Sequence, residues 1–137
     1  MKDQDYMLLA YKEVERSNCV RTKIGALIVK DGIFIGFGHN GTNYPHECFK
    51  NKSGLSFAEG DVYCVGTHAE QDALMQAHSN THSVLGSILY TTMRPCLACT
   101  KMIIKSGVRE VIWREDYSDL PTIKAQEESN ISFRRMP

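Results

Sequence analysis

The segments HAEQDALMQAH (68–78), SILYTT (87–92), PCLACTKMIIK (95–105) and VREVIW (108–113) decide the fold class. Small apolar residues recur at helical spacing in the first segment, and the third begins with a proline, which suits the first turn of a helix. Gly107 is placed to end that helix. The second and fourth segments are rich in β-branched and aromatic residues, so we predict that they are strands. Alternating helices and strands are typical of an α/β domain.

The residues before this stretch predict a helix, a hairpin and a long loop. The helix covers residues 5–17, with apolar residues at roughly helical spacing. These apolar residues are Leu8, Leu9, Tyr11 and Val14. Residues 24–29 and 33–37 flank an Asp-Gly turn, and such a pair between two β-rich runs predicts a β-hairpin. Residues 38–67 show no period, so we expect a long loop, a kind of segment that often carries function.

The remaining residues complete an alternating pattern. Residues 121–129 are a predicted helix, and residues 131–134 are a predicted short final strand. Thr67 is the expected N-cap of the helix that starts at His68, with Glu70 closing a capping box. We therefore predict a single domain over residues 1–137. Its fold class is α/β, a three-layer α/β/α sandwich around a central mixed five-stranded sheet.

Composition limits the classes of function. The chain has 137 residues, of which 42% are hydrophobic and 23% charged, and 16 basic residues balance 16 acidic ones. Because nucleic-acid-binding proteins usually carry a basic excess, a nucleic-acid partner is disfavoured. No signal-peptide pattern or membrane-length apolar run occurs, so we expect a cytoplasmic protein without membrane contact. The five cysteines are an odd number and are better explained as metal ligands than as disulfides.

Two motifs, His68-x-Glu70 and Pro95-Cys96-x-x-Cys99, supply the chemistry of a catalytic metal site. One imidazole and two thiolates suit tetrahedral Zn²⁺ and leave its fourth position for water. Both motifs fall at predicted helix starts, where the helix dipole favours thiolates. Glu70 is placed to move protons without binding the metal. The alternatives for the cysteine pair are a redox couple or half of a structural zinc site, and the added His-x-Glu motif disfavours both.

With these motifs the chain resembles the cytidine deaminase-like superfamily, whose zinc deaminases share the H-x-E…P-C-x-x-C signature. Within it, the chain is most similar to the deoxycytidylate (dCMP) deaminases and their competence-protein relatives. The resemblance rests on the following residues: Cys19-Val20-Arg21, Ile24–Val29, Gly38-His39-Asn40-Gly41, His68–Leu74, Leu89–Thr92, Pro95–Lys101 and Glu115-Asp116-Tyr117.

The resemblance implies deamination of dCMP to dUMP, which feeds thymidylate synthesis. It makes His68, Cys96 and Cys99 the ligands of zinc, which activates water for attack on C4 of cytosine. Glu70 then delivers a proton to N3 and helps to expel ammonia. The substrate-binding residues it implies are Arg21, Asn40, Ala69 and Tyr117. Arg21 would meet the phosphate, although a solvated helix-end arginine and a turn-forming asparagine remain alternative interpretations for Arg21 and Asn40.

The remaining cysteines raise a second metal question. Some dCMP deaminases hold a structural zinc on the long loop, and Cys19 and Cys48 match the expected places. Cys64 is a third candidate ligand, and His46 or Glu59 a fourth. A closed zinc would order a loop that has little core of its own. The alternative is that these are ordinary buried or free cysteines.

The family also suggests regulation and assembly. Many dCMP deaminases are homohexamers that dCTP activates and dTTP inhibits with Mg²⁺. The expected place of the regulatory nucleotide is Gly38, His39, Asn40 and Gly41. His39 departs from the more usual tyrosine, which puts the allosteric response in doubt.

Two competing functions remain. One is another deaminase of the same fold, acting on cytidine, dCTP or a tRNA base. In this chain Arg94 precedes Pro95, where tRNA adenosine deaminases usually have glutamate. The other is a non-catalytic, zinc-stabilised interaction module, against which Glu70 argues because a structural zinc needs no such carboxylate.

Overall fold

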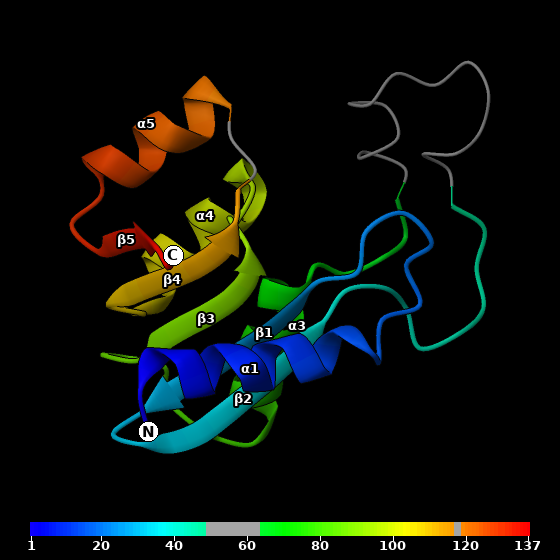
Figure 1. Cartoon of the computed structure of the whole chain (residues 1–137), viewed down its shortest axis with the longest axis horizontal. Helices are drawn as coiled ribbons and strands as arrows, with labels where there is room; N and C mark the ends of the chain where they lie inside the picture. Colours follow the sequence, from blue (N-terminus) through cyan, green and yellow to red (C-terminus); the bar gives the residue numbers. More distant parts are fainter. Residues whose placement is uncertain (49–63, 117–118) are drawn as a thin grey trace.

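A computed structural model describes residues 1–48, 64–116 and 119–137 (Figure 1). No helix in this part of the chain has the length and apolar character needed to cross a membrane. The elements in chain order are α1 (Asp3–Val14), β1 (Gly25–Lys30), β2 (Ile33–His39), α3 (Ala69–Ser79), β3 (Ile88–Met93), α4 (Leu97–Ser106), β4 (Glu110–Glu115), α5 (Leu120–Glu128) and β5 (Ser132–Arg135).

The strands form one mixed sheet in the order β2-β1-β3-β4-β5. β1 is antiparallel to both β2 and β3, whereas β3, β4 and β5 are parallel. The hairpin turns at Asp31 and Gly32, whose φ angles of 50° and 76° are those of the primed turns that two-residue hairpins favour. The predicted mixed five-stranded sheet is confirmed.

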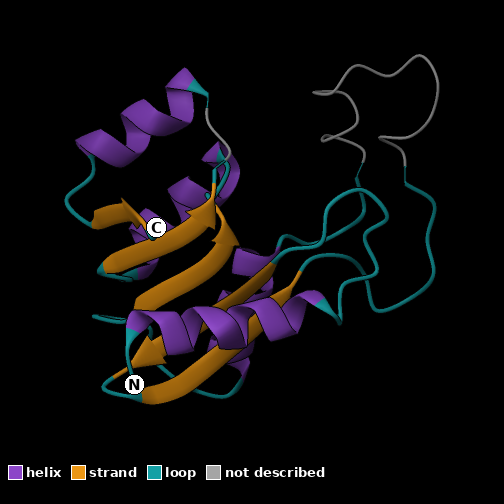
Figure 2. Ribbon diagram, in the orientation of Figure 1, coloured by secondary structure: helices purple, strands orange, loops and turns teal. Residues whose placement is uncertain are grey.

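Helices cover both faces of this sheet (Figure 2). Successive side chains of a strand point to opposite faces, and β1 divides its residues in that way. Ala26 and Ile28 belong to the core cluster that contains α3 and α4 residues. Leu27 and Val29 belong to a second cluster, formed with α1. The two clusters on opposite faces confirm the three-layer α/β/α prediction.

The buried face of α1 includes part of the predicted apolar set, because Leu9 and Tyr11 pack against the core. Met7, Ala10 and Glu13 are buried, whereas Leu8 is 61% exposed. The rotation of the helix follows from its contact with the sheet. Ala10 lies over Gly25 so closely that a Cβ on Gly25 would overlap the Ala10 carbonyl oxygen. This contact turns the small residue inward, and Leu8 faces away from the core.

The start of α3 also differs from the prediction. The N-cap is His68, one residue later than expected, and its backbone N–H donates to Gln71 Oε1 over 3.0 Å. Thr67 instead pairs with Gly41 through two backbone hydrogen bonds of 2.8 and 2.9 Å. Because its backbone is held in this bridge, Thr67 cannot cap the helix.

The start of α4 shifts in the same way. The N-cap is Cys96, so Pro95 precedes the helix instead of opening it. Gly107 ends α4 with a left-handed φ of 97°, which confirms the predicted stop. Both predicted helices are therefore present; α3 begins one residue later than predicted and α4 begins two residues later.

Gly38 of β2 lies directly beneath the first turns of α3. An added Cβ would overlap the Ala69 carbonyl oxygen and touch the Ala73 backbone nitrogen. We expect Gly38→Ala to lower the free energy of unfolding by about 1–3 kcal/mol, the usual cost of overpacking. Urea unfolding measures this loss. To make room for the added methyl group, α3 would have to move away from β2, and the start of this helix carries His68.

Gly66→Ala is the matched control for Gly38→Ala. The nearest heavy atom to a Cβ on Gly66 is the Gly41 Cα at 3.5 Å, an ordinary van der Waals contact. We expect this variant to stay within about 0.5 kcal/mol of the unsubstituted chain. Equal losses in the two variants would contradict the packing argument.

Candidate active site

A cavity opens where three strands meet loops at one end of the sheet. The β3 strand ends there, and the antiparallel β1 begins and β2 ends beside it. Ligands in open α/β sheets bind outside the carboxyl ends of parallel strands. The cavity has a volume of about 200 Å³. Its lining residues are Cys19, Arg21, Thr22, Ile24, Asn40, Gly41, His46, Cys48, Cys64, Gly66, Thr67, His68, Glu70, Met93, Arg94 and Cys96.

The three predicted metal ligands meet at this cavity. His68 and Cys96 are the N-caps of α3 and α4, and Cys99 lies one turn into α4. His68 Nδ1 is 3.5 Å from Cys96 Sγ and 3.2 Å from Cys99 Sγ. Among the described residues, this is the one group of at least three potential ligands whose ligand atoms lie within 4.8 Å of one another.

This donor set fits Zn²⁺. A tetrahedral ion with Zn–S near 2.3 Å and Zn–N near 2.0–2.1 Å needs its nitrogen and sulfur ligands about 3.5 Å apart. The two N···S distances, 3.2 and 3.5 Å, are close to that value. The backbone thus places the three donors at zinc-binding separation.

The two thiols are electrostatically coupled. Hydrogen bonding from Cys99, with a further contribution from His68, lowers the pKa of Cys96 to about 4 despite its burial. The same hydrogen bond, together with burial, raises the pKa of Cys99. Because zinc binds the thiolate form, a metal must displace the proton of any thiol that becomes its ligand.

Glu70 is the second residue of α3 and is only 4% exposed. Its carboxyl group lines the cavity beside the ligand cluster. Burial raises its pKa, and the neighbouring His68 partly opposes that shift. A raised pKa makes the carboxylate a stronger base, which suits a group that takes up and returns a proton as a general acid–base catalyst.

The family model for the cytidine and deoxycytidylate deaminase zinc-binding region matches residues 1–115. The chain belongs to this family. It is 32% identical over 123 residues to a deoxycytidylate deaminase of Mycobacterium phage D29, covering 83% of this chain and 94% of that protein. It is 31% identical over 139 residues to the deoxycytidylate deaminase of Saccharomyces cerevisiae, covering 97% of this chain but 44% of the yeast protein.

Solved structures of the same family have a similar fold. The crystal structure of a dCMP deaminase from the cyanophage S-TIM5, in complex with dCMP and dUMP, superposes with a TM-score of 0.82. The identity is 32%, and the match covers 99% of each chain. The cytidine deaminase-like fold predicted from the sequence is thereby confirmed.

Two of the substrate-binding residues predicted from the deaminase family, Arg21 and Asn40, line the cavity. The Asn40 amide also has a structural role: Oδ1 accepts hydrogen bonds from Ser17 Oγ (2.7 Å) and the Ile24 N–H (2.8 Å). Its Nδ2 donates to the Thr22 carbonyl oxygen over 2.6 Å. Asn40 thus holds the segment that carries Arg21.

The other two predicted substrate residues are placed differently. Ala69 is fully buried and packs in the core between α3 and the sheet, so its side chain does not line the cavity. Any contact of Ala69 with a substrate would come from its main chain. Tyr117 lies outside the described residues.

Four of the five residues predicted as ligands of a second zinc reach the cavity wall. Cys19, Cys48, Cys64 and His46 line it, and Glu59 lies outside the described residues. Among the described residues, however, these four do not form a second group with ligand atoms within 4.8 Å. The Nδ1 atom of His46 is 2.9 Å from Thr42 Oγ1. A second zinc stays a prediction.

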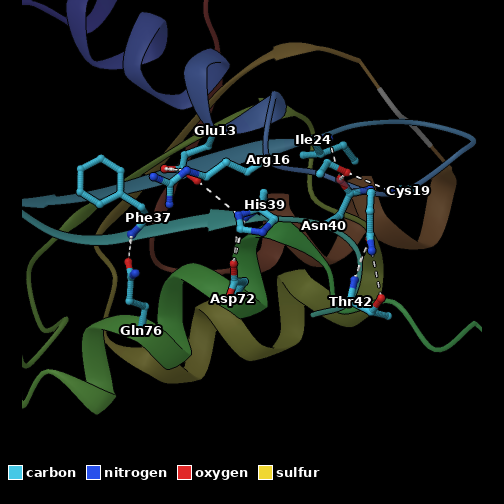
Figure 3. A network of polar contacts seen from close by, with 12 residues as sticks. Glu13, Arg16, Cys19, Ile24, Phe37, His39, Asn40, Thr42, Asp72 and Gln76 are labelled. Carbon is cyan, nitrogen blue, oxygen red and sulfur yellow. Dashed lines mark hydrogen bonds and ion pairs between the residues drawn. The ribbon is translucent and has the colours of Figure 1, made fainter. Parts of the chain in front are cut away.

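The segment predicted to bind a regulatory nucleotide packs between two helices (Figure 3). His39 Nδ1 lies 3.3 Å from Glu13 Oε2 of α1 and 3.7 Å from Asp72 Oδ2 of α3. The His39 backbone N–H donates to the same Asp72 oxygen over 3.0 Å. Gly38 packs under α3, and Gly41 pairs with Thr67. Packing contacts therefore account for Gly38, His39 and Gly41 in this motif. Binding of a regulatory nucleotide at these residues stays a prediction.

Arg94 lines the cavity, although no role for it was predicted from the sequence. Its guanidinium stacks 4.5 Å from the centre of the Trp113 ring and lies 3.3 Å from Asp116 Oδ1. The signal in the sequence was its position directly before the Pro95-Cys96 motif. Its partners, about twenty residues further along the chain, gave no signal.

Proposed function

We propose that this protein is a zinc-dependent hydrolase that converts dCMP and water to dUMP and ammonia. The observation that carries the proposal is the cluster of His68, Cys96 and Cys99, with the buried Glu70 beside it in one cavity. This arrangement combines a zinc-type donor set with a carboxyl group suited to proton transfer.

The residues of the chain divide the chemistry between them. Zinc, when bound, would lower the pKa of water so that a nucleophile is available at neutral pH. Glu70 Oε accepts a proton from the attacking water and donates it to N3 of the cytosine ring. Glu70 then takes the second proton from the oxygen newly bonded to C4 and delivers it to the C4 amine. The C4–N bond breaks, the C4=O bond of uracil forms, and ammonia leaves. The low exposure of Glu70 keeps bulk water from competing for these protons.

Arg21 is the proposed partner of the 5′-phosphate. It lines the cavity on the segment that Asn40 holds in place. We expect Arg21→Ala to raise KM for dCMP about 10- to 100-fold, because a hydrogen bond to a charged group contributes about 1.5–3 kcal/mol. Steady-state kinetics should show a much smaller change in KM for deoxycytidine, which lacks the phosphate. Equal changes for both substrates would rule out phosphate binding by Arg21.

The alternative functions fit the site less well. The balanced charge of the chain gives little attraction for tRNA, whose binding depends on phosphate contacts. A purely structural zinc module would need no carboxyl group, yet Glu70 is buried beside the metal ligands. The cavity also carries a cation suited to a monophosphate, which cytidine would not require.

Several finer features remain proposals from the family resemblance. They are a homohexameric assembly, activation by dCTP and inhibition by dTTP with Mg²⁺ through residues 38–41, a second zinc, and a cytoplasmic location. Rates of dCMP turnover with and without each effector test the regulation. The carboxylates of Glu13 and Asp72 beside His39 would oppose an anionic nucleotide at that side chain.

A further inference from the structure

Gln126 of α5 contacts both ends of the segment that carries the two cysteine ligands. The α5 helix packs against α4 (Figure 1). The Gln126 side chain is buried, at 3% exposure. Its Nε2 donates to the Pro95 carbonyl oxygen over 3.3 Å and to Thr100 Oγ1 over 3.0 Å. Pro95 and Thr100 flank Cys96 and Cys99, so one amide contacts the main chain before the ligand pair and a side-chain hydroxyl directly after it.

The backbone of the segment makes the first helical bond of α4, from the Thr100 N–H to the Cys96 carbonyl oxygen over 2.8 Å, but its side chains provide little support. No side chain caps the first turn of α4, since the N-cap residue is Cys96 and its sulfur faces His68. The Pro95 carbonyl oxygen receives a long hydrogen bond of 3.5 Å from Thr100 Oγ1. The shorter bonds from Gln126 therefore contribute a large part of the polar contacts that fix this turn.

Arg94 holds the amide of Gln126 in its orientation. Arg94 Nε donates to Gln126 Oε1 over 2.9 Å, which leaves the Nε2 group of Gln126 directed at Pro95 and Thr100. The guanidinium is itself fixed between the Trp113 ring and Asp116. The support thus runs from the end of β4 to the metal-ligand segment.

We infer that Gln126 is a positioning residue for the cysteine pair. By holding the Pro95 carbonyl group before Cys96 and the Thr100 hydroxyl after Cys99, it keeps both sulfurs at ligand distance from His68 Nδ1 and slows the loss of the metal. The inference rests on the proposed zinc site. Partners outside the ligand set commonly change metal affinity about 10- to 100-fold. Because these bonds of Gln126 go to Pro95 and Thr100 and act on the ligands indirectly, we expect an effect near the lower end of that range.

The test uses the zinc-loaded protein and measures how fast a chromogenic chelator in excess removes the metal. Gln126→Leu keeps the approximate volume of the side chain and removes all three hydrogen bonds. We expect it to release zinc about tenfold faster than the unsubstituted protein. The measurement is made at a temperature well below the thermal unfolding midpoint of each variant. Global unfolding then does not contribute to the rate of zinc release.

Thr122→Val is the matched control. Thr122 is fully buried in the same helix, and its Oγ1 has no hydrogen-bond partner among the described residues. The control should release zinc at the unsubstituted rate. A Gln126→Leu rate within twofold of the Thr122→Val rate would overturn the inference. Should Gln126→Leu fail to fold, Thr100→Val decides by the same criterion, because it removes the hydroxyl that accepts from Gln126 and donates to Pro95.

The zinc measurement separates this inference from the proposed function. Protein that deaminates dCMP but shows equal release rates would refute the role of Gln126 alone. Faster release from Gln126→Leu, in protein that never deaminates dCMP, would support the positioning role and refute the proposed substrate. Protein that binds no zinc would refute both.

Discussion

Glu70→Gln should retain zinc and lose nearly all deaminase activity. The substitution preserves the size of the side chain and removes the group that accepts and returns protons. General acid–base catalysis contributes about 10²- to 10⁴-fold, so we expect kcat to fall by that factor or more. Zinc content should stay unchanged because Glu70 is outside the ligand cluster. Metal analysis and turnover of dCMP on one sample measure both quantities.

Asp72→Asn is the control for this loss. Asp72 lies two residues further along α3 and accepts the His39 backbone N–H, a bond that an asparagine oxygen can still accept. It does not line the cavity. The substitution should change the free energy of unfolding only slightly. We therefore expect activity within about threefold of the unsubstituted protein. A Glu70→Gln protein that is zinc-loaded and fully active would remove Glu70 from the mechanism.

Cys99→Ala should lose both zinc and activity. Cys99 is fully buried, and its sulfur is 3.2 Å from His68 Nδ1, the shorter of the two N···S distances. Two remaining protein ligands are too few for a catalytic zinc, which normally has three. Zinc content should fall from about one per chain to near zero after dialysis, and dCMP turnover should fall with it.

Cys64→Ala separates the ligand cluster from the other cysteines. Cys64 lines the same cavity but is not a member of the group within 4.8 Å. The Cys64→Ala protein should therefore keep the zinc that His68, Cys96 and Cys99 bind. Two zinc ions in the unsubstituted chain and one in Cys64→Ala would support the second metal site, whereas one ion in each would reject it. Retention of zinc by Cys99→Ala would contradict the ligand assignment.

The ligand cluster was predictable because its geometry is local. Cys96 and Cys99 are three residues apart at a helix start, so the helix itself places them on one turn. His68 stands at the start of the other helix on the same face of the sheet. The alternation of helices and strands then suffices to bring the two starts together.

Features that depend on distant contacts were not predictable. The rotation of α1 is set by Gly25 beneath Ala10, and residue periodicity within the helix does not contain that contact. The pairing of Thr67 with Gly41 likewise joins residues far apart in the sequence, and it moved the N-cap to His68. A local capping pattern cannot reveal such a competing partner.

The polar partners of the site show the same limit. Gln126 reaches Pro95 from the C-terminal helix, and nothing near either residue in the sequence links them. His39 lies between carboxylates from α1 and α3, a contact that exists only once both helices pack on β2. Motifs therefore predicted the reacting groups, whereas the residues that hold those groups required the structure.

The most direct test of the account is the turnover of dCMP by zinc-loaded protein, compared with deoxycytidine, cytidine and dCTP under the same conditions. Loss of dCMP should match the formation of dUMP and ammonia in equal amounts, and kcat/KM should be highest for dCMP. Fully zinc-loaded protein that forms no dUMP, or that prefers deoxycytidine, would contradict the proposed function.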